Sequence, residues 1–292
     1  MPARGSGCHM PESMSANTKR VIVCADDFAI NASASIGIAK LARMGRLSAT
    51  SAMVLSPRWP QDAVLLQDLR DQLDVGLHLD WTSDFALAAG HGMPLGRAMG
   101  RALLGGLDRT QASTVIERQL DLFERHWQAP PDFVDGHQHV QQFAGIREAL
   151  VATLVRRYGA HAVQPYLRIS RAPPGLADLK SRVIAWMGAN ALEAIAASAN
   201  LVVTRGLVGI YNFDGGPQQY AALMTRWLAR APAGAILMCH PAQAAEPDDV
   251  IGIARAQEFA YLASPDFASA LQQAQVLVGR GSDVTPTAKI HP

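Results

Sequence analysis

The sequence contains no tract of basic residues and no long apolar run, and each absence excludes a class of protein. Its 292 residues carry 26 lysines and arginines against 25 aspartates and glutamates, so the charge is nearly balanced. A balanced chain without a basic tract is not expected to bind nucleic acid. No stretch approaches the roughly 18 consecutive apolar residues of a membrane span, so we expect none. Nothing in the sequence predicts an oligomeric state.

Cysteines are few, and the N-terminal segment has no apolar core. The three cysteines (Cys8, Cys24 and Cys239) are odd in number and far apart, which indicates reduced thiols and a cytoplasmic protein rather than a disulfide framework. Residues 1–20 are rich in Gly, Ser and Pro and do not form a secretory signal. We expect a disordered extension over residues 1–19 and one domain over residues 20–292.

Two common catalytic motifs are also missing. No Gly-rich phosphate loop of the Walker or dinucleotide type follows a predicted strand. No Gly-x-Ser-x-Gly motif is present, which argues against a serine hydrolase of the α/β type. The chain is rich in apolar residues, which make up 49% of the sequence and are enough for a large hydrophobic core.

Strand-like and helix-like segments alternate along the chain. Short apolar runs predict strands at 21–25, 47–55, 75–79, 133–135, 162–169, 201–204, 235–238 and 276–278. Helical periodicity and caps predict helices at 32–44, 59–73, 114–127, 145–158, 176–199, 217–230, 251–263 and 265–274. Gly45 is placed to close the first helix, and Thr114 with Glu117 fits a capping box. Residues 81–107 show no clear period and are expected to form a long loop.

This alternation predicts an α/β protein with a mainly parallel sheet and helical crossovers. Seven or eight strand-helix units in one chain favour a single-domain (β/α) barrel, irregular or incompletely closed. A doubly wound open sheet is the main alternative.

Ionisable residues follow several of the predicted strands. Asp26 and Asp27 end the first strand, His78 the third, His137 and His139 come after the fourth, and His240 ends the seventh. Arg168 lies near the end of the fifth. In both parallel architectures the working site lies at the carboxyl ends of the strands, so these side chains converge on one rim. Adjacent carboxylates repel unless a cation or a proton lies between them.

Each candidate also has a structural explanation. The Asp26-Asp27 pair could belong to a turn, His78 to the core, and His240 to the turn before Pro241. If the chain is extended at His137 and His139, both point to one face; if it turns at Gly136, only one need bind a metal, and we favour His137. Asp135 is expected to support a histidine rather than to bind metal.

Two histidines and one carboxylate are a common donor set for a divalent metal. This set suits Zn²⁺ and also Mn²⁺, Co²⁺ or Ni²⁺, whereas Mg²⁺ prefers oxygen ligands. A neighbouring carboxylate can take a proton from the water that the metal activates, and a histidine on the opposite side can protonate a leaving group.

The chain resembles the YdjC-like carbohydrate deacetylases, which include chitooligosaccharide and hopanoid-associated deacetylases. The resemblance rests on motifs at residues 25–28, 76–79, 135–140, 239–241 and 258–262 and on Arg168, and it covers roughly residues 20–280. It implies an often incompletely closed (β/α) barrel and metal-dependent hydrolysis of an N-acetyl group on a sugar, commonly with Mg²⁺.

The resemblance also implies residue roles. Asp26 would be the general base, and His240 the acid. Asp27, His78 and His137 would bind one divalent metal ion, Zn²⁺ or Mg²⁺. Arg168 would orient Asp26 or contact the substrate. The implied substrate is an N-acetylated oligosaccharide or a glycolipid.

Two residues depart from the family pattern. Ala29 stands where a Gly is usual, so the turn beneath the carboxylates would differ slightly, and Gln141 stands where a His is usual. These departures are the features that favour an alternative function, a catalytically weakened sugar- or metal-binding protein. Residues 81–107 and 170–200 are expected to shape the pocket. Trp81, Met93, Leu95, Trp186 and Met187 would form its apolar wall or belong to the core.

Overall fold

The computed structural model describes residues 18–284 as one α/β unit. Its strands are β1 (Lys19–Phe28), β2 (Ala49–Ala52), β3 (Asp74–Leu79), β4 (Phe133–Gly136), β5 (Tyr166–Leu167), β6 (Leu207–Val208), β7 (Ile236–Cys239) and β8 (Val276–Val278). Its longer helices are α1 (Ala32–Arg43), α4 (Leu95–Leu103), α5 (Arg109–Trp127), α6 (Ile146–Tyr158), α7 (Leu179–Trp186), α8 (Ala189–Ser198), α9 (Gly216–Arg230), α10 (Gly252–Ala263) and α11 (Pro265–Gln273). The shorter ones are α2 (Trp59–Asp62), η1 (Ala63–Leu69), α3 (Asp84–Ala88), η2 (His137–Gln142) and α12 (Gly281–Val284).

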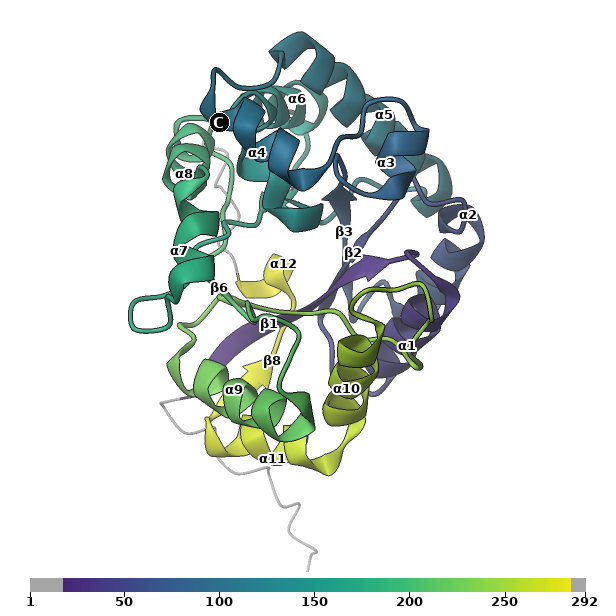
Figure 1. Ribbon diagram of the computed structural model, residues 1–292, viewed down its shortest axis with the longest axis vertical. Helices are drawn as coiled ribbons and strands as arrows, with labels where there is room; N and C mark the ends of the chain where they lie inside the picture. Colours follow the sequence, from purple (N-terminus) through teal and green to yellow (C-terminus); the bar gives the residue numbers. More distant parts are fainter. Residues whose placement is uncertain (1–17, 285–292) are drawn as a thin grey trace, which may run out of the picture.

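The strands form a parallel sheet in the order β5-β4-β3-β2-β1-β7-β6, and β8 pairs with the first residues of β1. The helices lie around the outside of this sheet (Figure 1). The edge strands β5 and β6 do not pair with each other. Residues 202–204 lie beside β5 instead, where the Leu167 N–H donates to the Val202 carbonyl at 2.9 Å and the Thr204 N–H donates to the Leu167 carbonyl at 3.0 Å. The predicted incompletely closed barrel is confirmed.

Alternate residues of the strands pack on opposite sides of the sheet. One face, inside the barrel, carries a small buried cluster: Ile22, Cys24, Ala49, Phe133, Tyr166, Leu207, Ile236 and Met238. The other face belongs to the main core, where Val21, Val23 and Ala25 of β1 pack with residues of the helices. Near-continuous apolar strands of this kind are typical of parallel sheets covered on both faces. The inner cluster forms the floor beneath the rim.

Local signals explain several helix boundaries. Asn31 caps α1 by accepting from the Ala34 N–H at 2.8 Å. Gly45 closes it at φ 67°, as predicted, because its N–H and that of Arg46 bond back to carbonyls of the last turn. α5 begins earlier than predicted, at Arg109 with Asp108 as its cap, so the capping box proposed at Thr114 is wrong.

Three other predicted elements differ in the structure. Residues 81–107 contain α3 and α4 rather than a continuous loop. The helix predicted at 176–199 is divided into α7 and α8 at Gly188, whose φ is 142°. The strand predicted at 201–204 is wrong, since only Val203 forms a bridge there and β6 lies at Leu207–Val208.

The extension predicted for residues 1–19 lies outside the described residues, except that Lys19 already begins β1. Within residues 18–284, no helix combines the length and apolar character that crossing a bilayer requires.

Candidate active site

Strand alternation delivers most of the polar side chains to the rim. Side chains two residues apart on a strand point to the same face. Two residues beyond the floor positions 24, 49, 76, 133, 166 and 238, the strands reach a polar layer made of Asp26, Ser51, His78, Asp135, Arg168 and His240. The barrel interior therefore has an apolar layer at its floor and a polar layer above it, at the carboxyl ends of the strands.

Asp27 reaches the same rim through a break in β1. Regular alternation would point it away from its neighbour Asp26, but its φ is 65° and the pairing of β1 with β2 is irregular between Ala25 and Phe28. Ala29 also has a positive φ, 72°, in the region that glycine favours. Seryl hydroxyls bond both its N–H and its carbonyl, at 3.1 and 2.6 Å, so the turn keeps a glycine-like conformation despite the Cβ.

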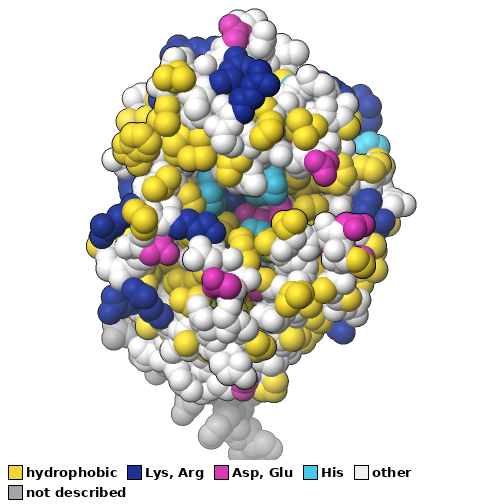
Figure 2. Space-filling view, in the orientation of Figure 1, with side chains coloured by type: hydrophobic (Ala, Val, Ile, Leu, Met, Phe, Trp, Pro, Cys, Tyr) yellow, Lys and Arg dark blue, Asp and Glu magenta, His cyan; other side chains and the backbone are white. Residues whose placement is uncertain are grey.

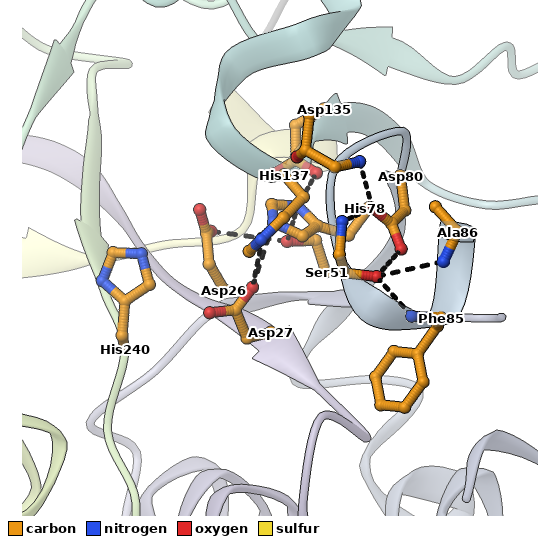
Figure 3. A network of polar contacts seen from close by, with 12 residues as sticks. Asp26, Asp27, Ser51, His78, Asp80, Phe85, Ala86, Asp135, His137 and His240 are labelled. Atoms are coloured by element: carbon orange, nitrogen blue, oxygen red, sulfur yellow. Dashed lines mark hydrogen bonds and ion pairs between the residues drawn. The ribbon is translucent and has the colours of Figure 1, made fainter. Parts of the chain in front are cut away.

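One carboxylate oxygen of Asp27 faces two imidazole nitrogens (Figure 3). Its Oδ1 lies 3.0 Å from Nδ1 of His137 and 3.3 Å from Nε2 of His78. The three donor atoms all lie within 4.8 Å of one another. Two imidazole nitrogens and one carboxylate oxygen fit a divalent metal in number and chemistry. Because His137 is partly exposed, the group also has an open side.

His78 is held from behind by a second carboxylate. Its Nδ1 lies 2.6 Å from Oδ1 of Asp135 and 3.0 Å from Oγ of Ser51, which leaves Nε2 directed at Asp27. A carboxylate behind a ligating histidine sets its tautomer and orientation. Burial lowers the pKa of His78, but the surrounding carboxylates outweigh burial and raise it to about 10. The same negative surroundings favour a divalent cation.

Asp26 has a different partner from Asp27. Both of its oxygens accept from the guanidinium of Arg168, at 2.7 and 2.8 Å, and Arg168 also lies 2.8 Å from Asp135. Burial raises the pKa of Asp26, but the positive charge of Arg168 outweighs it and leaves the pKa well below its usual range. Cys24, Asp26 and Asp135 also lie close enough to share an ion, but the Arg168 cation already bridges the two carboxylates, at 2.7 and 2.8 Å.

His240 lies across the rim from the two histidines (Figure 3). Its ring packs edge-on against Phe213, with centroids 5.1 Å apart, and its main-chain N–H donates to buried Glu258. Nδ1 of His240 has no hydrogen-bond partner among the described residues, although it is buried. Burial lowers the pKa of His240 to about 4, against the opposing effect of Asp27 and Asp26.

Arg255 is a site residue that sequence reasoning missed. From α10, its Nη2 lies 2.7 Å from Oδ2 of Asp27 and its Nε lies 2.7 Å from Asp249, while its Nη1 donates to the His240 carbonyl at 3.4 Å. Arg255 is 2% exposed. It therefore fixes the oxygen of Asp27 that faces away from the histidines. Arg255 follows no strand, so the strand-end pattern contained no signal for it.

The second histidine of the Asp-Gly-His-Gln-His motif turns away from the donor group. Gln138 and His139 have φ values of 54° and 62°, so the chain is not extended here. Nδ1 of His139 lies 3.0 Å from Oγ of Ser170. Gln141 is buried and donates to the Arg168 carbonyl and to Ser170, both at 3.1 Å. The Gln at this position thus supports the strand end that carries Arg168.

A cavity of about 590 Å³ opens above these groups, with histidines and carboxylates at its base (Figure 2). Both expected segments contribute to it, 81–107 through Leu95 and Met99 and 170–200 through Lys180, Val183, Ile184 and Met187. Of the apolar wall expected from the sequence, Leu95 and Met187 line the cavity. Trp81 and Met93 belong to the buried core instead, and Trp186 is exposed.

Two curated relatives align with part of the chain. It is 29% identical over 167 residues to a chitooligosaccharide deacetylase of Enterobacter sp. (strain 638), covering 53% of this chain and 66% of that protein. It is 28% identical over 131 residues to a chitooligosaccharide deacetylase of Proteus mirabilis (strain HI4320), covering 43% of this chain and 51% of that protein. The matched region thus spans less than two thirds of either relative.

Solved structures and a family profile give the broader relationship. A protein of Enterococcus faecalis V583, described as a candidate cellobiose-phosphate cleavage protein, has a TM-score of 0.68 at 17% identity, covering 92% of this chain and 100% of that one. The Xyl-CE4 domain of a multidomain xylanase from the hindgut metagenome of Trinervitermes trinervoides has a TM-score of 0.50 at 9% identity. The match covers 92% of this chain and 90% of that one. Both share the fold. The profile of the family described as "YdjC-like protein" matches residues 20–273, so the chain belongs to the YdjC-like protein family.

Proposed function

We propose that this protein is a metal-dependent hydrolase that removes an N-acetyl group from an amino sugar in an oligosaccharide or a glycolipid. Family membership and the deacetylase relatives support the reaction class. The observation that carries the proposal is the division of the Asp26-Asp27 pair: Asp27 faces two imidazoles, whereas Asp26 is paired with Arg168. Adjacent carboxylates in different surroundings can serve as metal ligand and as base.

Asp27, His78 and His137 would hold the cation. A bound divalent metal supplies a Lewis acid for the acetyl carbonyl and makes water acidic enough to act as a nucleophile near neutral pH. Asp135 and Arg255 keep His78 and Asp27 in position, as their contacts at 2.6 and 2.7 Å indicate. The donor set suits Zn²⁺, Mn²⁺, Co²⁺ or Ni²⁺, and the carboxylate also suits Mg²⁺.

Asp26 accepts the proton of the attacking water. Its low pKa keeps it ionised, and the two hydrogen bonds from Arg168 fix its plane, so Arg168 acts as a positioning residue. A weakly basic carboxylate takes the proton only as the water becomes more acidic during attack. The resulting tetrahedral intermediate breaks at its C–N bond, which yields acetate and an amine.

His240 is the group placed to handle the leaving amine. It lies opposite the histidines and lines the cavity, and its Nδ1 has no hydrogen-bond partner within residues 18–284. With a pKa of about 4 it is neutral in the resting site near pH 7. It therefore takes up the proton that Asp26 received from the water and donates it to the amine nitrogen as the C–N bond breaks, which returns Asp26 to its ionised form. The two aspartates, which raise its pKa, favour that transient charge.

The test is acetate release from a panel of N-acetylated oligosaccharides and glycolipids, with and without a chelator. The expected result is release that stops with the chelator and returns with added metal, together with a product in which hydrogen replaces one acetyl group. Release that is insensitive to the chelator would exclude the mechanism. Metal binding without turnover on any member of the panel would favour the weakened binding protein instead.

A further inference from the structure

Two helices that line the cavity also expose apolar side chains to solvent. The rim patch consists of Leu103 and Leu104 at the end of α4 and of Leu179, Val183 and Trp186 on α7, which are 52%, 90%, 79%, 41% and 70% exposed. Val183 also lines the cavity, so the patch continues into it. Figure 2 shows hydrophobic side chains gathered around the mouth of the cavity, in the orientation that looks into it. Exposed apolar groups at the mouth of a pocket mark an interaction surface.

The charges on these two helices have one sign. α4 carries Arg97 and Arg101, and α7 carries Lys180 and Arg182, and neither helix contains an acidic residue. The side chains of Arg97, Arg101 and Arg182 are exposed and form no ion pair within residues 18–284. The carboxylates near these helices are Asp178, which caps α7 by accepting from the Ser181 N–H at 2.8 Å, and Asp214, and both act on Lys180 rather than on the three arginines.

The opposite side of the mouth differs in charge. There the segment before α10 contains Glu246, Asp248 and Asp249, and Asp249 is paired with Arg255. Arg255 on this side is thus paired with carboxylates, whereas Arg97, Arg101 and Arg182 on the α4 and α7 side have no ion pair within residues 18–284. A surface that combines apolar side chains, a tryptophan and unpaired cations matches an anionic lipid interface, where the rings lie at headgroup level and cations meet lipid phosphates.

We propose that the rim patch binds the surface of an anionic lipid bilayer and so places the cavity mouth against lipid headgroups. One consequence of this inference rests on the proposed function, namely that the acetylated sugar would be presented on a lipid. Binding itself requires neither metal nor turnover. The apolar cavity wall that Val183, Ile184 and Met187 form then continues the path from the lipid surface to the site.

Trp186 provides a built-in reporter. Of the five tryptophans, Trp59, Trp81, Trp127 and Trp227 are at most 5% exposed, so changes in fluorescence on vesicle binding come from Trp186. The experiment adds the full chain to vesicles of phosphatidylcholine alone or mixed with phosphatidylglycerol. Emission and co-sedimentation are measured. We expect a blue shift, loss of quenching by acrylamide, and binding that requires the anionic lipid and weakens with salt.

Matched variants distinguish binding through the rim patch from nonspecific hydrophobic binding to vesicles. The double variant Leu179→Ser/Trp186→Ser should weaken partitioning by about tenfold or more, because each change removes an apolar side chain from the interface. Arg97→Gln/Arg101→Gln should weaken it by about fivefold per charge on anionic vesicles only. Val64→Ser/Val163→Ser changes side chains that are 66% and 64% exposed but line no part of the cavity, and should bind normally.

Three results would overturn the inference. The first is that the protein does not bind anionic vesicles. The second is that Leu179→Ser/Trp186→Ser binds them as strongly as the parent protein. The third is that, without lipid, the protein forms a dimer in which Trp186 is shielded from acrylamide. Asp26→Asn should bind vesicles like the parent. Vesicle binding by a protein that releases no acetate would count against the proposed function and leave the lipid surface standing.

Discussion

The roles of the adjacent carboxylates predict opposite behaviour for Asp26→Asn and Asp27→Asn. Asparagine keeps the size of each side chain and removes its charge, so the two variants are matched. Asp26→Asn should lower the rate of acetate release by about 10²–10⁴-fold, the usual contribution of a general base, which corresponds to about 3–5 kcal/mol of activation free energy. Its metal affinity should change by less than about tenfold, because neither oxygen of Asp26 belongs to the Asp27-His78-His137 group.

Asp27→Asn should instead lose the metal. Its Oδ1 is the one carboxylate oxygen of that group, and an amide oxygen is a much weaker ligand, so affinity should fall by at least about 100-fold. Activity then falls with occupancy and should partly return at high metal concentration. The activity of Asp26→Asn should not return.

Stability separates these effects from unfolding. In Asp26→Asn, Arg168 keeps its contact with Asp135 at 2.8 Å, and the amide oxygen still accepts one of its two hydrogen bonds. The cost should be about 1–3 kcal/mol of unfolding free energy, the loss of one charged partner in a buried network. Calorimetric metal titration, acetate release and urea unfolding should be measured on all three proteins. If Asp26→Asn loses metal as completely as Asp27→Asn, the assignment of base and ligand is wrong.

Three further predictions follow from individual contacts. Arg255→Gln should weaken metal binding by about 10–100-fold, because it frees the outer oxygen of Asp27, and calorimetric titration giving unchanged affinity would contradict that role. Burial and a neighbouring carboxylate raise the pKa of half-buried Asp132 from 3.8 to about 7, so its contribution to stability is greatest below pH 4 and is lost as the pH rises toward 7. Asp132→Asn should therefore gain about 1–2 kcal/mol at pH 8 and little at pH 4 in urea unfolding, and a gain that is equal at both values would rule this out. Gly209→Ala should destabilise the fold by about 2 kcal/mol or more, because φ is 100° and the new Cβ would lie 2.1 Å from a main-chain oxygen of β7. The matched change Gly96→Ala, in α4 with open space around it, should stabilise by about 0.5–1 kcal/mol, and thermal unfolding compares the two.

Local interactions explain which elements could be predicted. Gly45 and the apolar runs of β1, β3, β4 and β7 depend on residues close in the sequence. α4 contains Gly96 and Gly100, which weaken helical propensity, and it is stabilised by packing of Ala98, Leu95 and Met99. The pairing of residues 202–204 with β5 likewise depends on a strand distant in the sequence. The pattern of residues along one sequence contains no information on the packing of α4 or on the pairing of residues 202–204 with β5.

The sequence by itself determined the polar rim, because alternation along a strand is a local property and parallel strands end at one edge. This places Asp26, His78 and His240 together without any knowledge of their distances. Only the tertiary structure decided how the adjacent carboxylates differ. The backbone break at Asp27 and the arrival of Arg255 from α10 depend on contacts between residues up to 228 positions apart. Those contacts form only when the strands and α10 assemble in the folded protein, and they give neighbouring residues of identical chemistry separate partners.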